Sequence, residues 1–89
     1  MRAVLRYITE VLKEPQTAKR VYVSIKGQIM TLEQMPFRFP LVRDEALAAR
    51  GLRWMPAENY SVFYLADERL REVHILRVFH SRREWQGLL

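Results

Sequence analysis

The sequence predicts an α+β fold, with helices in the N-terminal part of the chain and antiparallel strands in the C-terminal part. Two observations indicate this class. Apolar residues recur at helical spacing between residues 3 and 34, whereas tyrosine, valine and phenylalanine are concentrated in two runs after residue 58. The chain has 89 residues, the size of one small domain. We therefore expect a single domain over residues 1–89 without a large, deep pocket.

Two amphipathic helices are predicted before residue 35. The first starts at Ala3 and places its apolar residues on one side, namely Val4, Leu5, Ile8, Val11 and Leu12. Glu14 and Pro15 end this helix, because the residue before a proline avoids the α region, while proline suits the first turn of the next helix. The second helix covers residues 16–34 and has the same apolar period. The two stripes predict a helical hairpin, in which Gly27 would serve close packing.

The segment that follows, residues 35–58, is predicted to be mostly irregular. Pro36 and Pro40 end the second helix and enforce extended or turn geometry. Residues 44–49 have helical propensity but are too few to form a helix alone, so we expect a loop with at most one turn. Residues 51–55 alternate loosely and predict a short strand that is stopped by Pro56.

A β-hairpin is predicted after residue 58. Residues 59–66 carry apolar side chains on both faces, which is typical of a central strand. Residues 67–70 supply the turn, and residues 71–80 form the partner strand. Strict alternation places one set of its side chains on a single face, namely Val73, Ile75, Arg77 and Phe79. Ser81 and Glu84 have the spacing of a capping box and would begin a last helical turn.

Composition limits the possible functions. The net charge is +5, and twelve of the 15 basic residues are arginine, which suits contacts to phosphate or carboxylate groups and indicates an anionic partner. There is no cysteine and there are two histidines, so we expect no metal and no other cofactor. Arg6, Thr9 and Glu10 interrupt the first apolar stretch, which therefore does not resemble a signal peptide, and no run reaches the length of a membrane span. We expect a cytoplasmic protein.

One group of residues is the candidate site, because its members belong to neighbouring predicted strands or to the segment just after the last one. They are Arg53, Tyr60, Tyr64, Arg77, His80, Arg82 and Arg83. Such a group would bind a phosphate backbone and would support metal-free RNA cleavage, with a general acid or base and a charge-stabilising arginine. In the simpler alternative, the tyrosines belong to the core and the arginines are solvated. No Ser-His-Asp triad, glycine-rich phosphate loop or carboxylate pair is recognisable.

The order of elements, together with Asn59–Tyr64 and Ile75–Arg83, resembles the RelE/ParE superfamily of toxins from bacterial type II toxin-antitoxin modules. The resemblance covers almost the whole chain. It implies an antiparallel sheet packed against the helical hairpin, and an antitoxin partner whose disordered, often acidic segment folds across the toxin. The family usually begins with a short strand, which is apparently absent here because Met1 leads almost directly into the first helix. The sheet would then have an open edge for antitoxin pairing or homodimerisation, unless the start codon is misassigned.

The superfamily has two main activities. RelE-like members cleave messenger RNA on the ribosome and commonly carry an arginine directly after the tyrosine of the central strand and a tyrosine near the C-terminus, where this chain has Ser61 and Trp85. ParE-like members, which act in plasmid stabilisation, inhibit DNA gyrase by protein-protein contact and are not enzymes. Residues 62–64 and 75–80, followed by Glu84, are closer to this branch.

The resemblance therefore favours a ParE-like gyrase inhibitor over a RelE-like messenger ribonuclease, and a degenerate toxin that acts only as a binding module is the third alternative. In the ParE-like or RelE-like interpretation, four residues would contact the protein target or the RNA: Arg53, Tyr60, Tyr64 and Trp85. Only in the RelE-like interpretation would four others be catalytic: Arg77, His80, Arg82 and Arg83.

Overall fold

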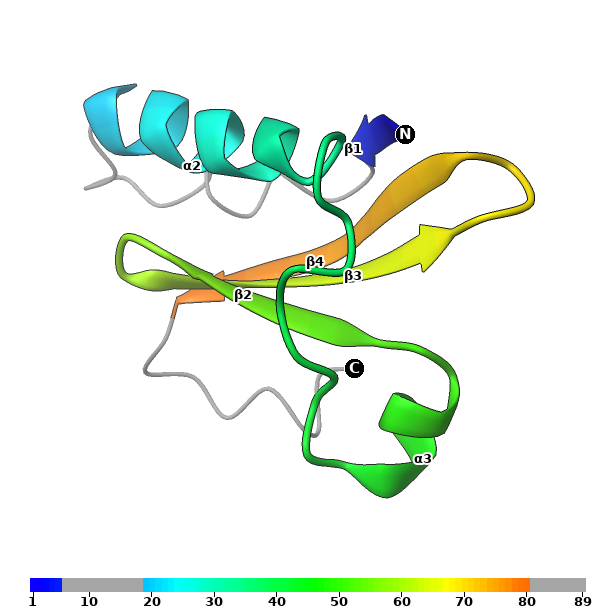
Figure 1. Cartoon of the computed structure of the whole chain (residues 1–89). Helices are drawn as coiled ribbons and strands as arrows, with labels where there is room; N and C mark the ends of the chain where they lie inside the picture. Colours follow the sequence, from blue (N-terminus) through cyan, green and yellow to red (C-terminus); the bar gives the residue numbers. More distant parts are fainter. Residues whose placement is uncertain (6–18, 81–89) are drawn as a thin grey trace.

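The structure, a computed structural model, describes residues 1–5 and 19–80 and confirms the α+β class. Four strands form one mixed sheet in the order β1-β4-β3-β2. Their bounds are Arg2–Leu5 for β1, Arg53–Ala57 for β2, Tyr60–Asp67 for β3 and Glu72–His80 for β4. Helix α2, Lys19–Thr31, lies over one face of this sheet, and the short helix α3, Glu45–Ala49, lies toward the other (Figure 1). No helix in the described ranges is long and apolar enough to cross a membrane.

Strand β1 corrects three predictions, because the first strand is present, residues 3–5 are not helical, and the sheet is mixed and not antiparallel. It runs parallel to β4, with Arg2 opposite Glu72. The terminal amine of Met1 donates to the Glu33 carbonyl oxygen at 2.8 Å, and the Ala3 N–H donates to Glu33 Oε2 at 2.8 Å. Short apolar runs fit a helix or a strand equally well, and here pairing with residues 70 positions away decides between them. Next to β4 the edge strand of the sheet is therefore β1, and β2 is the edge strand on the other side.

Helix α2 confirms the centre of the second predicted helix, with Ile25 and Ile29 buried against the sheet. The remainder of the first predicted helix falls on residues 6–18, outside the described residues, so the helical hairpin stays a prediction. Gly27 is exposed on α2, and no atom of the described residues lies within 4 Å of the position that a Cβ would take. The described residues therefore make no close contact with this glycine, and the helix that was predicted to pack beside α2 falls mostly on residues 6–18, outside the described residues.

Strand β2 continues through Pro56 to Ala57, so the predicted stop at the proline is wrong. The reason is the position of the strand at the edge of the sheet. Trp54 donates its backbone N–H away from β3, to the Pro40 carbonyl oxygen at 3.1 Å. Two residues later, the backbone nitrogen of Pro56 points to the same outer side. Its missing N–H therefore removes no hydrogen bond between β2 and β3.

The β3–β4 hairpin and the central position of β3 are confirmed, but the alternation along β4 is not. Phe63 lies opposite Arg77 and Tyr64 lies opposite Ile75, so Leu76 is an extra residue without a partner in β3. This bulge inverts the alternation that follows it. Val78 therefore joins Val73 and Ile75 in the core that faces α2, while Phe79 belongs to the core on the opposite face.

The opposite face carries a smaller core around Phe63 and Phe79, with Val42 and Leu52 contributed by the segment that contains α3. Asp44 begins α3 as its N-cap, since its Oδ1 accepts the Leu47 N–H at 3.0 Å. This five-residue helix is the single turn that the sequence predicted for residues 44–49. It covers only part of the sheet face beneath it.

Candidate recognition site

Two of the predicted site residues, Tyr60 and Tyr64, are core residues on the face toward α2. They are 6% and 0% exposed. The Tyr64 hydroxyl donates to the Pro36 carbonyl oxygen at 2.9 Å. Burial raises the pKa of Tyr64, and a backbone hydrogen bond with Phe39 and the positive charge of Arg53 partly oppose this rise. A side chain without exposed surface does not contact a partner in this conformation. In this conformation Tyr64 stabilises the fold.

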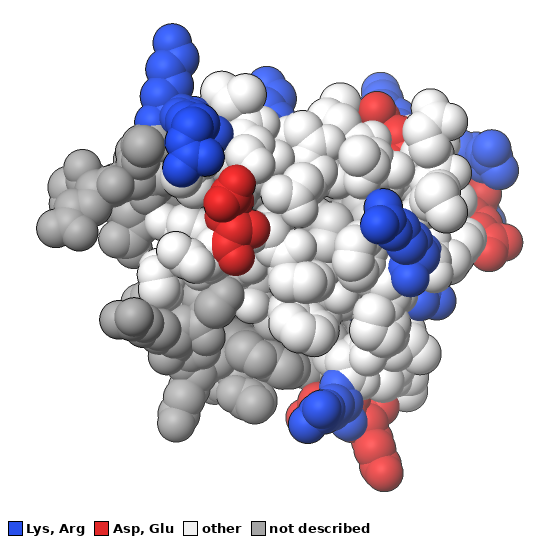
Figure 2. All heavy atoms as spheres, turned by 60° about the vertical axis from the view of Figure 1, so that its left-hand side comes forward, with Lys and Arg blue, Asp and Glu red and all other residues white. Residues whose placement is uncertain are grey.

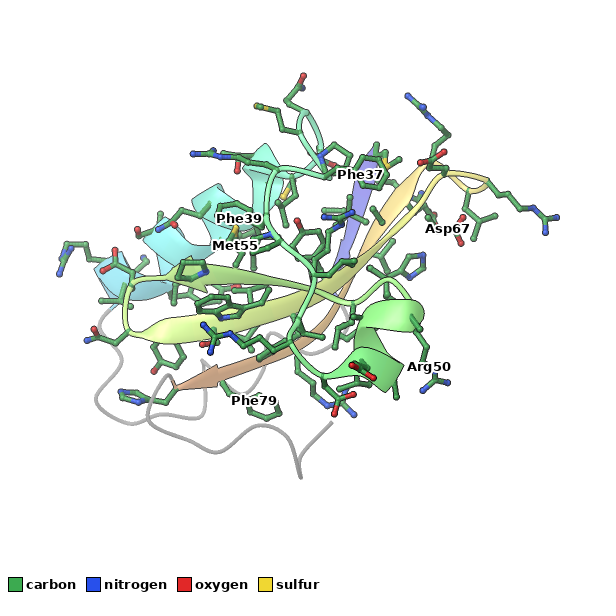
Figure 3. The ribbon with its side chains drawn as sticks, turned by 60° about the horizontal axis from the view of Figure 1, so that its bottom comes forward. Phe37, Phe39, Arg50, Met55, Asp67 and Phe79 are labelled. Carbon is green, nitrogen blue, oxygen red and sulfur yellow. The ribbon has the colours of Figure 1, made fainter. Side chains whose placement is uncertain are left out.

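Arg53 lies beside Tyr64, because the two residues are directly opposite each other in β2 and β3. Its Nη1 donates to the Phe39 carbonyl oxygen at 2.7 Å, and its Cζ lies 5.1 Å from the centroid of the Phe37 ring. Phe39 packs against the same core as Met55 (Figure 3). Arg53 and Tyr64 therefore hold the connection between α2 and α3 against the sheet through two backbone carbonyls.

Arg77 lies on the other face of the sheet, opposite Phe63, and its Nη1 donates to the Leu76 carbonyl oxygen at 2.7 Å. His80 lies at the end of β4 on the α2 face, where its half-buried ring meets the Tyr60 ring edge-on at a centroid distance of 5.4 Å. The strands also separate His80 from Arg53. His80 lies opposite Tyr60 in β3, and Tyr60 lies opposite Ala57 in β2. Ala57 is four residues along β2 from Arg53, a distance of about 13 Å.

The structure thus divides the predicted cluster. It brings Tyr60 to His80 and Tyr64 to Arg53, and it places Arg77 on the opposite face. Three further predicted site residues lie outside the described residues: Arg82, Arg83 and Trp85. Among the residues that the structure describes, no group of three histidine, aspartate or glutamate side chains suits a metal ion. The described positions do not converge on one reacting atom, as general acid-base chemistry requires.

A feature that the sequence did not indicate is a hollow of about 310 Å³ between α3 and the sheet. Its lining comes from separate parts of the chain, namely Leu47, Arg50, Leu52, Leu65 and Leu76. Leu76 is the bulge residue, and Gly51 takes a φ of +87°, which a residue with a side chain rarely adopts. No short sequence motif contains these residues, because they are distant in the sequence and come together only through the bulge and the turn after α3.

The basic side chains do not form one block on the face shown in Figure 2, where lysine and arginine are dispersed among acidic and uncharged residues. Near the N-terminus, the Glu72 carboxylate lies between the Arg2 guanidinium and His74, with His74 Nε2 at 3.2 Å from Glu72 Oε1. This pairing joins β1 to β4. The Arg2–Glu72 ion pair therefore stabilises the sheet and does not point to a ligand site.

The described residues define a small α+β domain, in which the predicted site residues do not meet at one point. Comparison with known families identifies the class further. The family described as the ParE toxin of the type II toxin-antitoxin system, parDE, matches residues 1–85, and the chain belongs to this family. The superfamily resemblance is therefore confirmed, and the protein is a toxin of a type II toxin-antitoxin system.

Among solved structures, the chain is similar to one in the toxin-antitoxin complex RelBE2 from Mycobacterium tuberculosis. The two are 22% identical with a TM-score of 0.71, and the match covers 89% of this chain and 95% of the other. At this identity the similarity establishes the fold. No curated protein sequence matches the chain significantly.

Proposed function

We propose that this toxin acts by protein-protein inhibition of DNA gyrase in the cytoplasm and has no enzymatic activity of its own. The observation that supports this proposal is the division of the predicted catalytic cluster between two faces of the sheet. Arg77 lies opposite Phe63 on one face, while Arg53 and His80 belong to the other and are about 13 Å apart along the strands.

Cleavage of a phosphodiester without a metal needs an acid, a base and a cation within hydrogen-bond reach of one phosphate. The described residues do not offer that arrangement, and the two tyrosines expected at such a site are buried. Inhibition by contact has no such requirement, because it depends on the shape and charge of a surface. Membership of the ParE family favours the same mechanism.

The second partner in this proposal is a cognate antitoxin. The similar structure from Mycobacterium tuberculosis is a toxin-antitoxin complex, and the net charge of +5 suits a partner segment that is acidic. Such a segment would be disordered alone and would order on the toxin. If a small antitoxin-like reading frame adjoins this gene, co-expression of the two and co-purification of their products test this partner.

Purified gyrase and relaxed plasmid provide the test of the target. Increasing amounts of the protein should abolish supercoiling, and prior addition of the antitoxin should restore it. Unchanged supercoiling at high molar excess, with growth arrest on induction, would overturn the gyrase proposal.

The ribosome-dependent ribonuclease remains the alternative, and it rests on the residue types of Arg77 and His80, which β4 places on opposite faces of the sheet. Under this alternative, induction should cut translated messages, and His80→Ala or Arg83→Ala should abolish the cuts. Normal growth on induction would instead identify a degenerate toxin that acts only as a binding module.

A further inference from the structure

The hollow beside α3 is an apolar site that the fold leaves open. Five described residues line it and four of them are leucines, of which Leu47, Leu65 and Leu76 are only partly buried. Its volume of about 310 Å³ lies at the lower end of the range in which proteins bind ligands or inserted side chains. Apolar surface of this kind is more stable when another group removes it from water.

The hollow exists because two backbone irregularities meet there. The bulge places Leu76 on the same face as Phe63 and Phe79, beside the partly buried Leu65. Gly51, at a φ of +87°, turns the chain directly after α3, and a Cβ there would lie 3.8 Å from Leu65 Cδ2. Since α3 has only five residues, it cannot extend over these leucines.

The charge at the rim is positive. Arg50 is the one polar residue among the described residues of the lining, and its side chain is exposed at the end of α3 (Figure 3). Within the described ranges, no hydrogen bond or ion pair engages its guanidinium, and no acidic residue lines the hollow. A guanidinium that no other described residue engages, beside an apolar hollow, suits a carboxylate that is adjacent to an apolar side chain.

We propose that the hollow seats an apolar side chain of the acidic antitoxin segment, while a neighbouring carboxylate of that segment pairs with Arg50. This proposal rests on the proposed function, because it assigns a docking site to the antitoxin named there. The site lies on the sheet face opposite α2. Binding at this position would cover the partly buried leucines and would neutralise the rim charge in one contact.

The test uses the full chain and the co-expressed antitoxin, with the dissociation constant measured by calorimetry for three single variants. Arg50→Glu reverses the rim charge, and Leu47→Glu places a charge in the hollow. Arg20→Glu makes the same charge change as the first variant on an exposed residue of α2, across the sheet. Both hollow variants should weaken binding by about tenfold or more, and Arg20→Glu should change it far less. Thermal unfolding shows whether each variant is folded.

A second measurement needs no substitution. Antitoxin binding to the unchanged chain should slow amide hydrogen exchange at residues 47–52 and 76. The site is wrong if the unchanged chain binds but these amides keep their exchange rates, or if Arg20→Glu weakens binding as much as Arg50→Glu. Either result would leave the antitoxin as partner at another surface. Failure of the unchanged chain to bind the antitoxin would instead overturn the partner assignment together with the site.

Discussion

Replacing Tyr64 with phenylalanine tests the contact that joins the connection after α2 to the sheet. The substitution keeps the fully buried ring and removes the hydroxyl that donates to the Pro36 carbonyl oxygen at 2.9 Å. A hydrogen bond of this kind contributes about 0.5–1.5 kcal/mol net, and the carbonyl that loses its partner adds to the cost. We expect Tyr64→Phe to lower the free energy of unfolding by about 1–2 kcal/mol at pH 7, measured by urea denaturation.

The same variant should also change the response to alkaline pH. Burial raises the folded-state pKa of Tyr64 above its ordinary value of 10.0. Below pH 10 the phenol is neutral in both states, so its contribution to stability is fully present. As the pH rises above 10, the unfolded chain releases the proton first, and the contribution is lost up to the raised folded-state pKa. The difference in stability between the natural protein and Tyr64→Phe should therefore decrease between pH 10 and the pH at which folded Tyr64 ionises.

Urea denaturation in steps from pH 7 to pH 11 measures both effects, and Tyr22→Phe is the control for the loss of a phenol elsewhere. Tyr22 lies on α2 and is partly buried. Two results would refute the reasoning. One is a Tyr64→Phe variant as stable as the natural protein at pH 7, and the other is a stability difference that stays constant through pH 11.

Three further changes test other parts of the structure. Glu33→Ala removes the acceptor of the Ala3 N–H and should destabilise the protein by about 1 kcal/mol while speeding hydrogen exchange in β1; unchanged exchange there would contradict the anchoring of this strand. Arg53→Lys keeps the charge but loses the planar group over Phe37, so the free energy of unfolding should fall by about 1 kcal/mol, and thermal unfolding that matches the natural protein would show that charge suffices. Pro56→Thr adds an outward N–H to the edge strand and should promote association seen by sedimentation; a monomer at the same concentration would show that proline does not protect this edge.

Local patterns in the sequence determined the α+β class, the core of α2, the β3–β4 hairpin and the central position of β3. These features depend on residues close together in the chain, whose periodicity reports directly which face is buried. The family resemblance, carried by the hairpin residues, is confirmed over residues 1–85.

The tertiary structure decided what depends on distant pairing. Val4 and Leu5 form a strand because β4 offers a parallel partner about 70 residues away. The candidate site was predicted from residue types on neighbouring strands, but the register turned Tyr60 and Tyr64 toward α2, and the bulge at Leu76 rearranged the residues after it. A one-residue shift in a strand exchanges its two faces, and nothing local in the sequence marks that shift. For the same reason, the sequence did not indicate that Arg50 lies beside four leucines in one hollow, because only the folded sheet brings these residues together.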